Sequence, residues 1–170
     1  LPYNYSTGSN VQTVDTDIYE YYAVKYYYDA GTNTDTRKIT VNMMNGGDGD
    51  VAETMESGKW SYVVGKFKAN GTVQQFHIIP MDGIGSQTLV ANGESIYIDK
   101  IILFKSQPSV ITVTFADEQG DKLSAVEAIN GEAVVYGGEE VTKTGYTFKG
   151  WAKAGTTEVA ETLTFTEDTT

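Results

Sequence analysis

The stretch that decides the fold is IYEYYAVKYYYD, residues 18–29. Its aromatic and β-branched residues are typical of a β-strand, in which successive side chains point to opposite faces. One face of this strand carries Tyr22, Val24, Tyr26 and Tyr28. The other face carries Tyr19, Tyr21, Lys25 and Tyr27. Because a two-layer sandwich buries only one face of each sheet, and because Lys25 is charged, we predict that the face with Lys25 is turned to solvent.

Period-two alternation continues along nearly the whole chain, which predicts an all-β protein. We expect further strands at 36–44, 59–68, 73–80, 95–105, 110–116, 132–136, 146–152 and 161–166, with weaker candidates at 3–5 and 11–14. Four Asn-Gly pairs lie between these runs, where the chain must reverse with a positive φ. Only residues 118–131 have roughly helical spacing, and the alternative for that segment is a hairpin arm with DEQG as its turn.

A change of composition divides the chain at Pro108. Ten of the twelve tyrosines precede it, and Thr, Glu, Val and Gly dominate after it. Proline cannot donate a hydrogen bond to a sheet ladder, which makes it a natural boundary. We predict a β-sandwich domain at 1–107 and a smaller module at 108–170.

The bulk composition excludes several kinds of partner. The net charge is −11, and the longest cluster of basic residues is Arg37-Lys38, so we predict binding neither to nucleic acid nor to an anionic membrane. No apolar run approaches the length of a membrane span. The absence of cysteine excludes disulfides, thiolate metal sites and a cysteine nucleophile.

The second module contains GYTFKGW at 145–151, preceded by YGGEEV and followed by TFTEDTT. This pattern resembles the internalin-B-type, or Listeria–Bacteroides, repeat of bacterial surface proteins. The resemblance implies a small β-grasp-like unit that serves as a spacer or adhesive module, and it carries no catalytic residues. In that family a further strand follows the threonines, so the repeat is expected to stop before its last strand at Thr170. We expect Tyr146, Phe148 and Trp151 to form the module's core, with a sugar-stacking platform as the alternative.

The first module contains Trp60 at the start of an expected strand, Pro80 at the end of another, and the run GESIYIDKIILF at 93–104. With these residues it resembles the jelly-roll or galactose-binding-like domains and carbohydrate-binding modules of bacterial extracellular proteins. The alternation of this last run fails after Asp99, and we expect IILF to be buried on both faces. The resemblance implies a sandwich and leaves the ligand open.

Two interpretations of the tyrosine-rich strand remain open. The rings of Tyr19, Tyr21 and Tyr27 form a row on a rigid strand, which suits stacking on the C–H faces of a glycan. The alternative is packing among tyrosines or under a loop or the second module. Tyr19, Tyr21 and Tyr27 are therefore the candidate ligand-binding residues.

The sequence offers few side chains for catalysis or metal binding. His77, the only histidine, lies in an expected strand and lacks evident partners for a triad. Oxygen ligands for calcium could come from Asn45, Asp48 and Asp50, but their spacing is not that of an EF-hand, and an acidic turn is the favoured interpretation. The acids Glu94 and Asp99 show no matching context for glycoside hydrolysis. We therefore predict neither an enzyme nor a bound cofactor, with calcium as the remaining alternative.

These observations predict a non-catalytic piece of a larger extracellular protein on the bacterial cell surface, with a role in adhesion, display or spacing. Its partners would be a glycan, a host or cell-surface protein, or other modules of the same polypeptide. The alternative is a carbohydrate-binding module of a polysaccharide-degrading protein.

Overall fold

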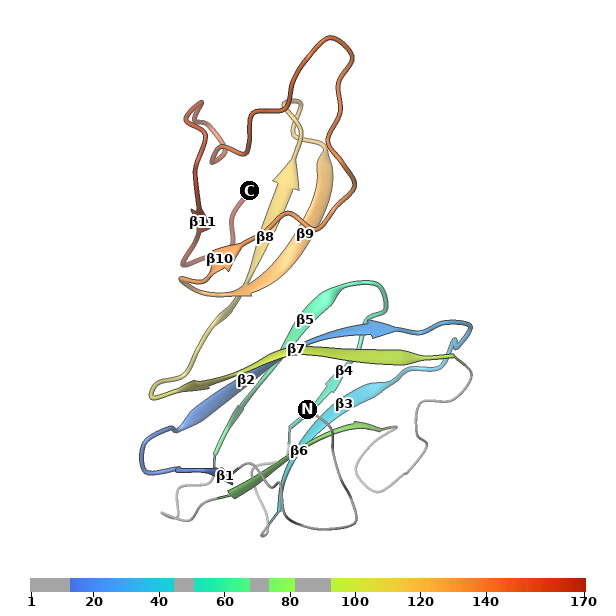
Figure 1. Ribbon diagram of the computed structural model, residues 1–170, viewed down its shortest axis with the longest axis vertical. Coiled ribbons are helices and arrows are strands. Elements are labelled where there is room, and N and C mark those ends of the chain that lie inside the picture. The colour runs from blue at the N-terminus through green and yellow to red at the C-terminus, as the bar shows by residue number, and fades with distance from the viewer. Residues whose placement is uncertain (1–12, 45–50, 68–73, 82–92) are drawn as a thin grey trace. The chain divides into compact units, whose positions relative to one another are not determined.

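The structure is a computed structural model that describes residues 13–44, 51–67, 74–81 and 93–170. Every regular element in that part of the chain is a β-strand, and the strands pair in antiparallel sheets (Figure 1). The described residues contain no helix that could cross a membrane. The mainly-β fold expected from the alternation is thus confirmed. The chain divides into two compact units, Leu1–Pro108 and Ser109–Thr170.

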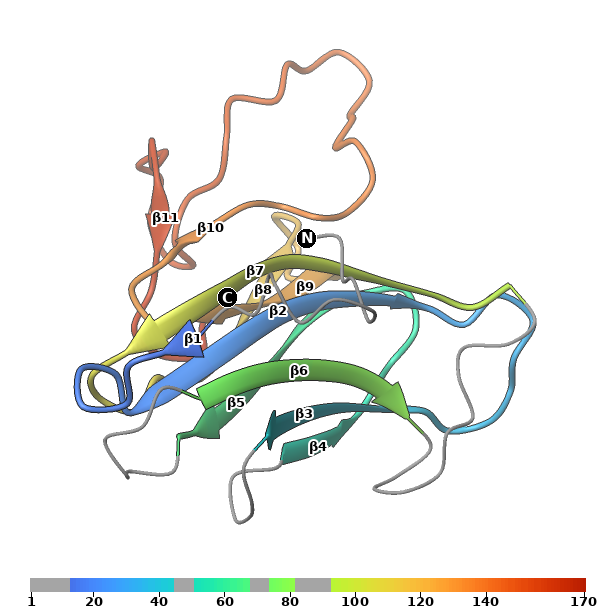
Figure 2. The same ribbon diagram turned by 60° about the horizontal axis from the view of Figure 1, so that its bottom comes forward.

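The first unit consists of two sheets. One has the strand order β1 (Thr13–Val14), β6 (Gln74–Met81), β3 (Lys38–Met44) and β4 (Val51–Thr54). The other has the order β5 (Trp60–Lys66), β2 (Tyr21–Asp29) and β7 (Ser95–Phe104). Figure 2 shows β2 and β7 lying over β6 and β3, so that the sheets form two layers. Strand β4 is not among the expected strands, and the weak candidate at 3–5 lies outside the described residues.

The core of the first unit lies between these layers and depends on β2. Tyr22 and Val24 are fully buried, and Tyr26 and Tyr28 are 2% and 3% exposed. They pack against buried side chains from the other layer and from β5, which include Ile39, Val41 and Val63. The face without Lys25 is therefore the buried one, as expected. Each buried ring removes roughly 150–250 Å² from water, so this face supplies much of the unit's hydrophobic stabilisation. On the face with Lys25, which we predicted to be turned to solvent, Tyr21, Lys25 and Tyr27 are partly exposed but Ala23 is fully buried.

Strand β7 is interrupted by a bulge at the point where its sequence alternation fails. Ile98 pairs with Tyr26, but Lys100 pairs with Lys25, so Asp99 is the extra residue of β7. Before the bulge the even-numbered residues of β7 pair with the inward-facing residues of β2, and after it the odd-numbered ones do. Ile101 therefore pairs with the inward-facing Val24. The expectation that IILF is buried on both faces was wrong, since Ile101 is 40% exposed and the next three residues are half-buried. A bulge rather than double burial accounts for the pattern.

The second unit begins with a hairpin of β8 (Val110–Ala116) and β9 (Lys122–Ile129). Its turn contains Asp117, whose Oδ1 accepts hydrogen bonds from the backbone N–H of Gln119 and Asp121. Gly120 adopts a φ of 91° in the same turn. The hairpin alternative for residues 118–131 is confirmed, and the helical one is wrong, because this turn chemistry favours reversal of the chain.

The rest of the second unit contains only the short pair β10 (Ala133–Val134) and β11 (Leu163–Thr164). The strand expected at 146–152 is reduced to a single bridge between Ala152 and Val159. A positive φ at Gly145 and at Gly150 turns the chain away from an extended path. The two expected flanking strands are likewise shorter than the alternation suggested.

The rings of this segment are divided between core and surface. Trp151 packs against Phe115 and Tyr136, with ring centroids 4.8 and 4.7 Å apart. Phe148 contacts Trp151 but is 50% exposed, and Tyr146 is 72% exposed. The expectation that all three rings form the core holds for Trp151 and is wrong for Phe148 and Tyr146. The turn at Gly145 takes the Tyr146 ring out of any strand, and Phe148 contacts Trp151 from the exposed side.

We predict that Gly65→Ala destabilises the first unit. Gly65 pairs with Tyr22, and a Cβ on Gly65 would lie 2.1 Å from the Tyr22 hydroxyl oxygen. Since Tyr22 is fully buried, its ring has no room to move aside. We expect a loss of about 1–3 kcal/mol in the free energy of unfolding, measured by urea denaturation.

Gly137→Ala is the matched control, because its nearest neighbour would be a Val126 methyl carbon at an ordinary 3.5 Å. Equal stability of Gly65→Ala and the native chain would show that Tyr22 does not pack on Gly65.

Candidate functional site

The best candidate site is a row of three rings on the outward face of the sheet β5-β2-β7. Tyr27 of β2 pairs with Trp60 of β5 on one side and with Tyr97 of β7 on the other. Residues directly opposite each other in an antiparallel sheet project from the same face, so the three rings stand side by side. Tyr27 is half-buried, whereas Trp60 is 40% and Tyr97 55% exposed. We call these three residues the outer row.

The rings of the outer row are close together but are not parallel. The centroid of Tyr27 is 5.5 Å from that of Trp60, and the ring planes are inclined by 54°. It is 6.1 Å from the centroid of Tyr97, with an inclination of 60°. These geometries are the tilted and edge-to-face arrangements that aromatic pairs prefer. The outer row is therefore a faceted surface that backbone ladders and ring contacts hold in place.

A charged pair, Lys25 and Asp99, lies beside the outer row on the same face of the sheet. Lys25 lies two residues before Tyr27, and its Nζ is 5.4 Å from the ring centroid of Trp60 and 6.0 Å from that of Tyr62. The same Nζ lies 3.4 Å from Oδ2 of Asp99, the extra residue of the β7 bulge. Side-chain exposures of 25% and 46% leave both groups accessible to water. A donor and an acceptor thus stand beside the rings.

The structure places the three candidate tyrosines in different surroundings. Tyr27 is the centre of the outer row. Tyr21 lies at the other end of β2, about 20 Å away at the usual rise of about 3.3 Å per residue, with Lys66 Nζ 5.2 Å from its ring centroid. Tyr19 precedes the strand and packs against the core, so the expectation that it shares the outward face was wrong. Its backbone N–H donates to Asp15 in a turn, which ends the alternation there.

The sequence did not identify Trp60 and Tyr97 as partners of Tyr27. Both lie in expected strands, and Trp60 already stood out as an aromatic residue at a strand start. Their approach to Tyr27 depends on which strands are neighbours and in which register they pair. Neither property can be obtained from the alternation of one strand.

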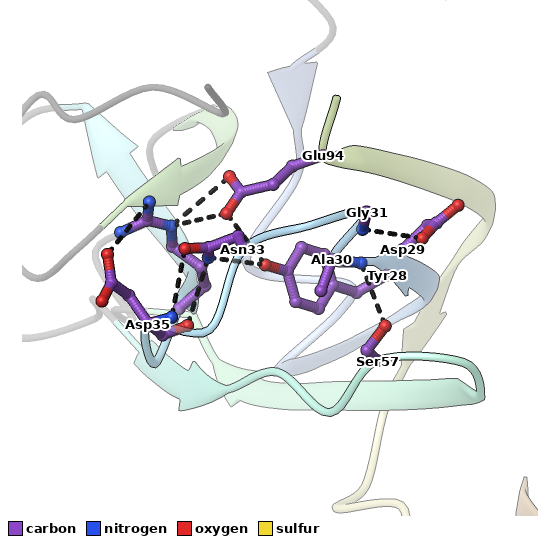
Figure 3. A network of polar contacts seen from close by, with 9 residues as sticks. Tyr28, Asp29, Ala30, Gly31, Asn33, Asp35, Ser57 and Glu94 are labelled. Atoms are coloured by element: carbon purple, nitrogen blue, oxygen red, sulfur yellow. Dashed lines mark hydrogen bonds and ion pairs between the residues drawn. The ribbon is translucent and has the colours of Figure 1, made fainter. Parts of the chain in front are cut away.

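A second group of polar side chains is buried at one end of the same unit (Figure 3). Arg37, just before β3, donates from Nε to Oε1 of Glu94 at 3.1 Å, and Glu94 stands just before β7. The Tyr28 hydroxyl donates to the same oxygen at 3.2 Å and accepts from the Asn33 side-chain amide at 3.4 Å. The Glu94 side chain is fully buried and that of Arg37 is 9% exposed. Because β3 and β7 belong to different layers, this ion pair ties the two sheets together.

Burial raises the pKa of the Tyr28 hydroxyl, and the nearby Glu94 carboxylate acts in the same direction. The phenol therefore stays neutral and remains a donor to Glu94. The two acids considered from the sequence are both engaged with cations, Glu94 with Arg37 and Asp99 with Lys25. We assign the buried group to holding the sandwich together.

The second unit contains a wide, open hollow of 1520 Å³. The rings of Phe148 and Trp151 line it, together with the charged Glu118 and Lys143. Lys143 Nζ donates to Glu118, and this hydrogen bond holds the pKa of the Glu118 carboxyl below its usual value. Glu118 is thus paired within the hollow.

The remaining candidates concern metals and the histidine. No group of three or more His, Cys, Asp or Glu residues in the described part of the chain could hold a metal ion. The possible calcium ligands Asn45, Asp48 and Asp50 lie outside the described residues. His77 lies in β6, opposite Asn42.

Comparisons with protein-family models, with curated proteins and with solved structures found no match to this chain. The resemblances to the Listeria–Bacteroides repeat and to carbohydrate-binding sandwiches therefore rest on the residues quoted from the sequence.

We predict that Arg37→Ala strongly destabilises the first unit. The substitution leaves the Glu94 carboxylate buried without its cation, which typically costs about 3–5 kcal/mol. The double variant Arg37→Met/Glu94→Leu should recover much of that loss, because it removes both buried charges. Urea denaturation of the three proteins provides the measurement.

Lys59→Ala is the control in the same unit, since Lys59 forms an exposed ion pair with Glu56 at 2.7 Å. We expect a change of at most about 1 kcal/mol there. If Arg37→Ala costs no more than Lys59→Ala, the buried pair does not hold the layers together.

Proposed function

We propose that this chain is a non-catalytic module of a bacterial extracellular or cell-surface protein, and that it acts in adhesion by binding glycans on its first unit. The observation that carries the proposal is the outer row of Tyr27, Trp60 and Tyr97. Flat rings that remain accessible on a rigid sheet suit the C–H faces of sugar rings. The exposed parts of Trp60 and Tyr97 provide no core packing, which leaves them available to a ligand.

The extracellular setting rests on the resemblance of residues 145–151 and their neighbours to the Listeria–Bacteroides repeat. Repeats of that kind present or space other modules on a bacterial surface. In this proposal the second unit has that role, and the first unit makes the contact with the glycan. If no glycan binds, display or spacing becomes the function of the whole chain.

A second candidate, favoured by the same outer row, is a carbohydrate-binding module attached to a polysaccharide-degrading protein. The two functions use the same surface and differ in the glycan. An adhesin would select the glycans of a host or neighbouring cell, whereas an enzyme's module would select the polysaccharide that the enzyme degrades.

We predict that the full 170-residue chain binds glycans on an array and that Trp60→Ala weakens this binding at least about tenfold, or ~1.4 kcal/mol. Trp60 is at the edge of the row and partly exposed, so its removal should leave the fold intact. Affinities should be measured by calorimetry with the best glycan, and folding checked by circular dichroism.

The matched control is Tyr146→Ala, which removes a ring that is 72% exposed in the second unit. It should leave the affinity unchanged. An array without any bound glycan would refute glycan adhesion, and binding that is indifferent to Trp60→Ala would place the site elsewhere.

A further inference from the structure

The outer row and the charged pair beside it also restrict the kind of glycan. From their geometry we infer that the ligand is a single, uncharged glycan chain in solution, and that the Lys25–Asp99 pair binds its hydroxyl groups. This inference rests on the proposed function and specifies its ligand.

The inclination of the rings argues against a crystalline surface as the ligand. The flat face of a crystalline polysaccharide can contact several rings at once only if those rings share a plane. Tyr27 is inclined by 54° to Trp60 and by 60° to Tyr97, so no plane contacts all three faces. A single chain can turn about its glycosidic bonds from one sugar to the next. It can therefore follow a faceted row.

The length of the outer row fits a short segment of such a chain. The three rings stand on three adjacent strands, and neighbouring strands lie about 4.8 Å apart. The row thus crosses roughly 10 Å, measured perpendicular to the strands. The glycan would lie across β5, β2 and β7 rather than along β2.

The charged pair explains how the same surface could recognise an uncharged sugar. Lys25 and Asp99 are 3.4 Å apart and together provide donors and an acceptor with no net charge. Adjacent hydroxyl groups of a sugar present the matching acceptor and donor. Lys25 is already paired with Asp99, which weakens its attraction to a uronic acid or a sulfate. Lys100 stands opposite Lys25 in the ladder, so this face also holds a second cation, and the anionic probe tests whether it attracts a polyanion. The chain's net charge of −11 further opposes a polyanion.

The experiment compares three classes of polysaccharide with the full chain. Soluble neutral probes are β-glucan, galactomannan and xylan, the soluble anionic probe is polygalacturonate, and the crystalline probes are microcrystalline cellulose and chitin. Affinity electrophoresis measures the soluble probes at low and at physiological salt, and sedimentation measures the crystalline ones. We expect retardation by at least one neutral probe and none by polygalacturonate. We expect no depletion by the crystalline probes.

Two variants test the contribution of the pair. Asp99→Ala should weaken binding to the neutral probe about five- to tenfold, because an exposed acceptor is lost while the ion pair itself contributes little to folding. Glu53→Ala is the control, since Glu53 is an exposed acid of β4 in the other sheet. It should have no effect on binding.

The outcomes separate this inference from the proposed function. Binding to a crystalline probe or to polygalacturonate that Trp60→Ala abolishes would overturn the inference and leave glycan binding by the outer row intact. Neutral binding that Asp99→Ala does not weaken would overturn the role of the charged pair. Failure of every probe, together with an empty glycan array, would refute the proposed function itself.

Discussion

The alternation of β2 is the constraint on which the first unit depends. Its inward residues fill the space between the sheets, with Tyr22 and Val24 fully buried. Its outward residues then have no choice of direction, and Tyr27 must stand on the opposite face. Because β2 is the middle strand, Tyr27 has a neighbour on both sides. The period of two therefore determines the core and the candidate site together, and a shift of one residue would exchange them.

One extra residue in β7 changes which residues of its second half share the face of the outer row. Without the bulge, alternation would continue through residues 97–104, and Asp99 would stand directly opposite Lys25 in the ladder. With it, Asp99 has no partner in the register but its carboxylate still lies beside Lys25, and Lys100 takes the position opposite Lys25. Bulges of this kind redirect a side chain at the cost of a local interruption in pairing. The bulge thus adds a second lysine beside the charged pair and turns Ile101 to the side of Val24.

The sequence predicts those features that depend on neighbouring residues. The buried face of β2 follows from its period, and the β8–β9 hairpin from turn residues such as Asp117 and Gly120. Features that need long-range pairing were missed. Trp60 and Tyr97 meet Tyr27 only through the strand order, and Arg37 meets Glu94 across 57 residues. Alternation predicted a strand at residues 146–152 that does not form, because Gly145 and Gly150 adopt a positive φ and interrupt the extended chain.

The rigidity of the sheet lets weak contacts between rings and sugars contribute to binding affinity. A single stacking contact contributes little, and ordering a flexible side chain on binding would offset much of it. In the outer row, each ring is attached to a paired strand and restrained by the ring beside it, and Lys25 lies near Trp60 and Tyr62. The buried ion pair of Arg37 and Glu94 joins β7 to the other layer close to Tyr97 in sequence. These contacts order the surface before any ligand arrives, so most of the stacking energy remains available for affinity.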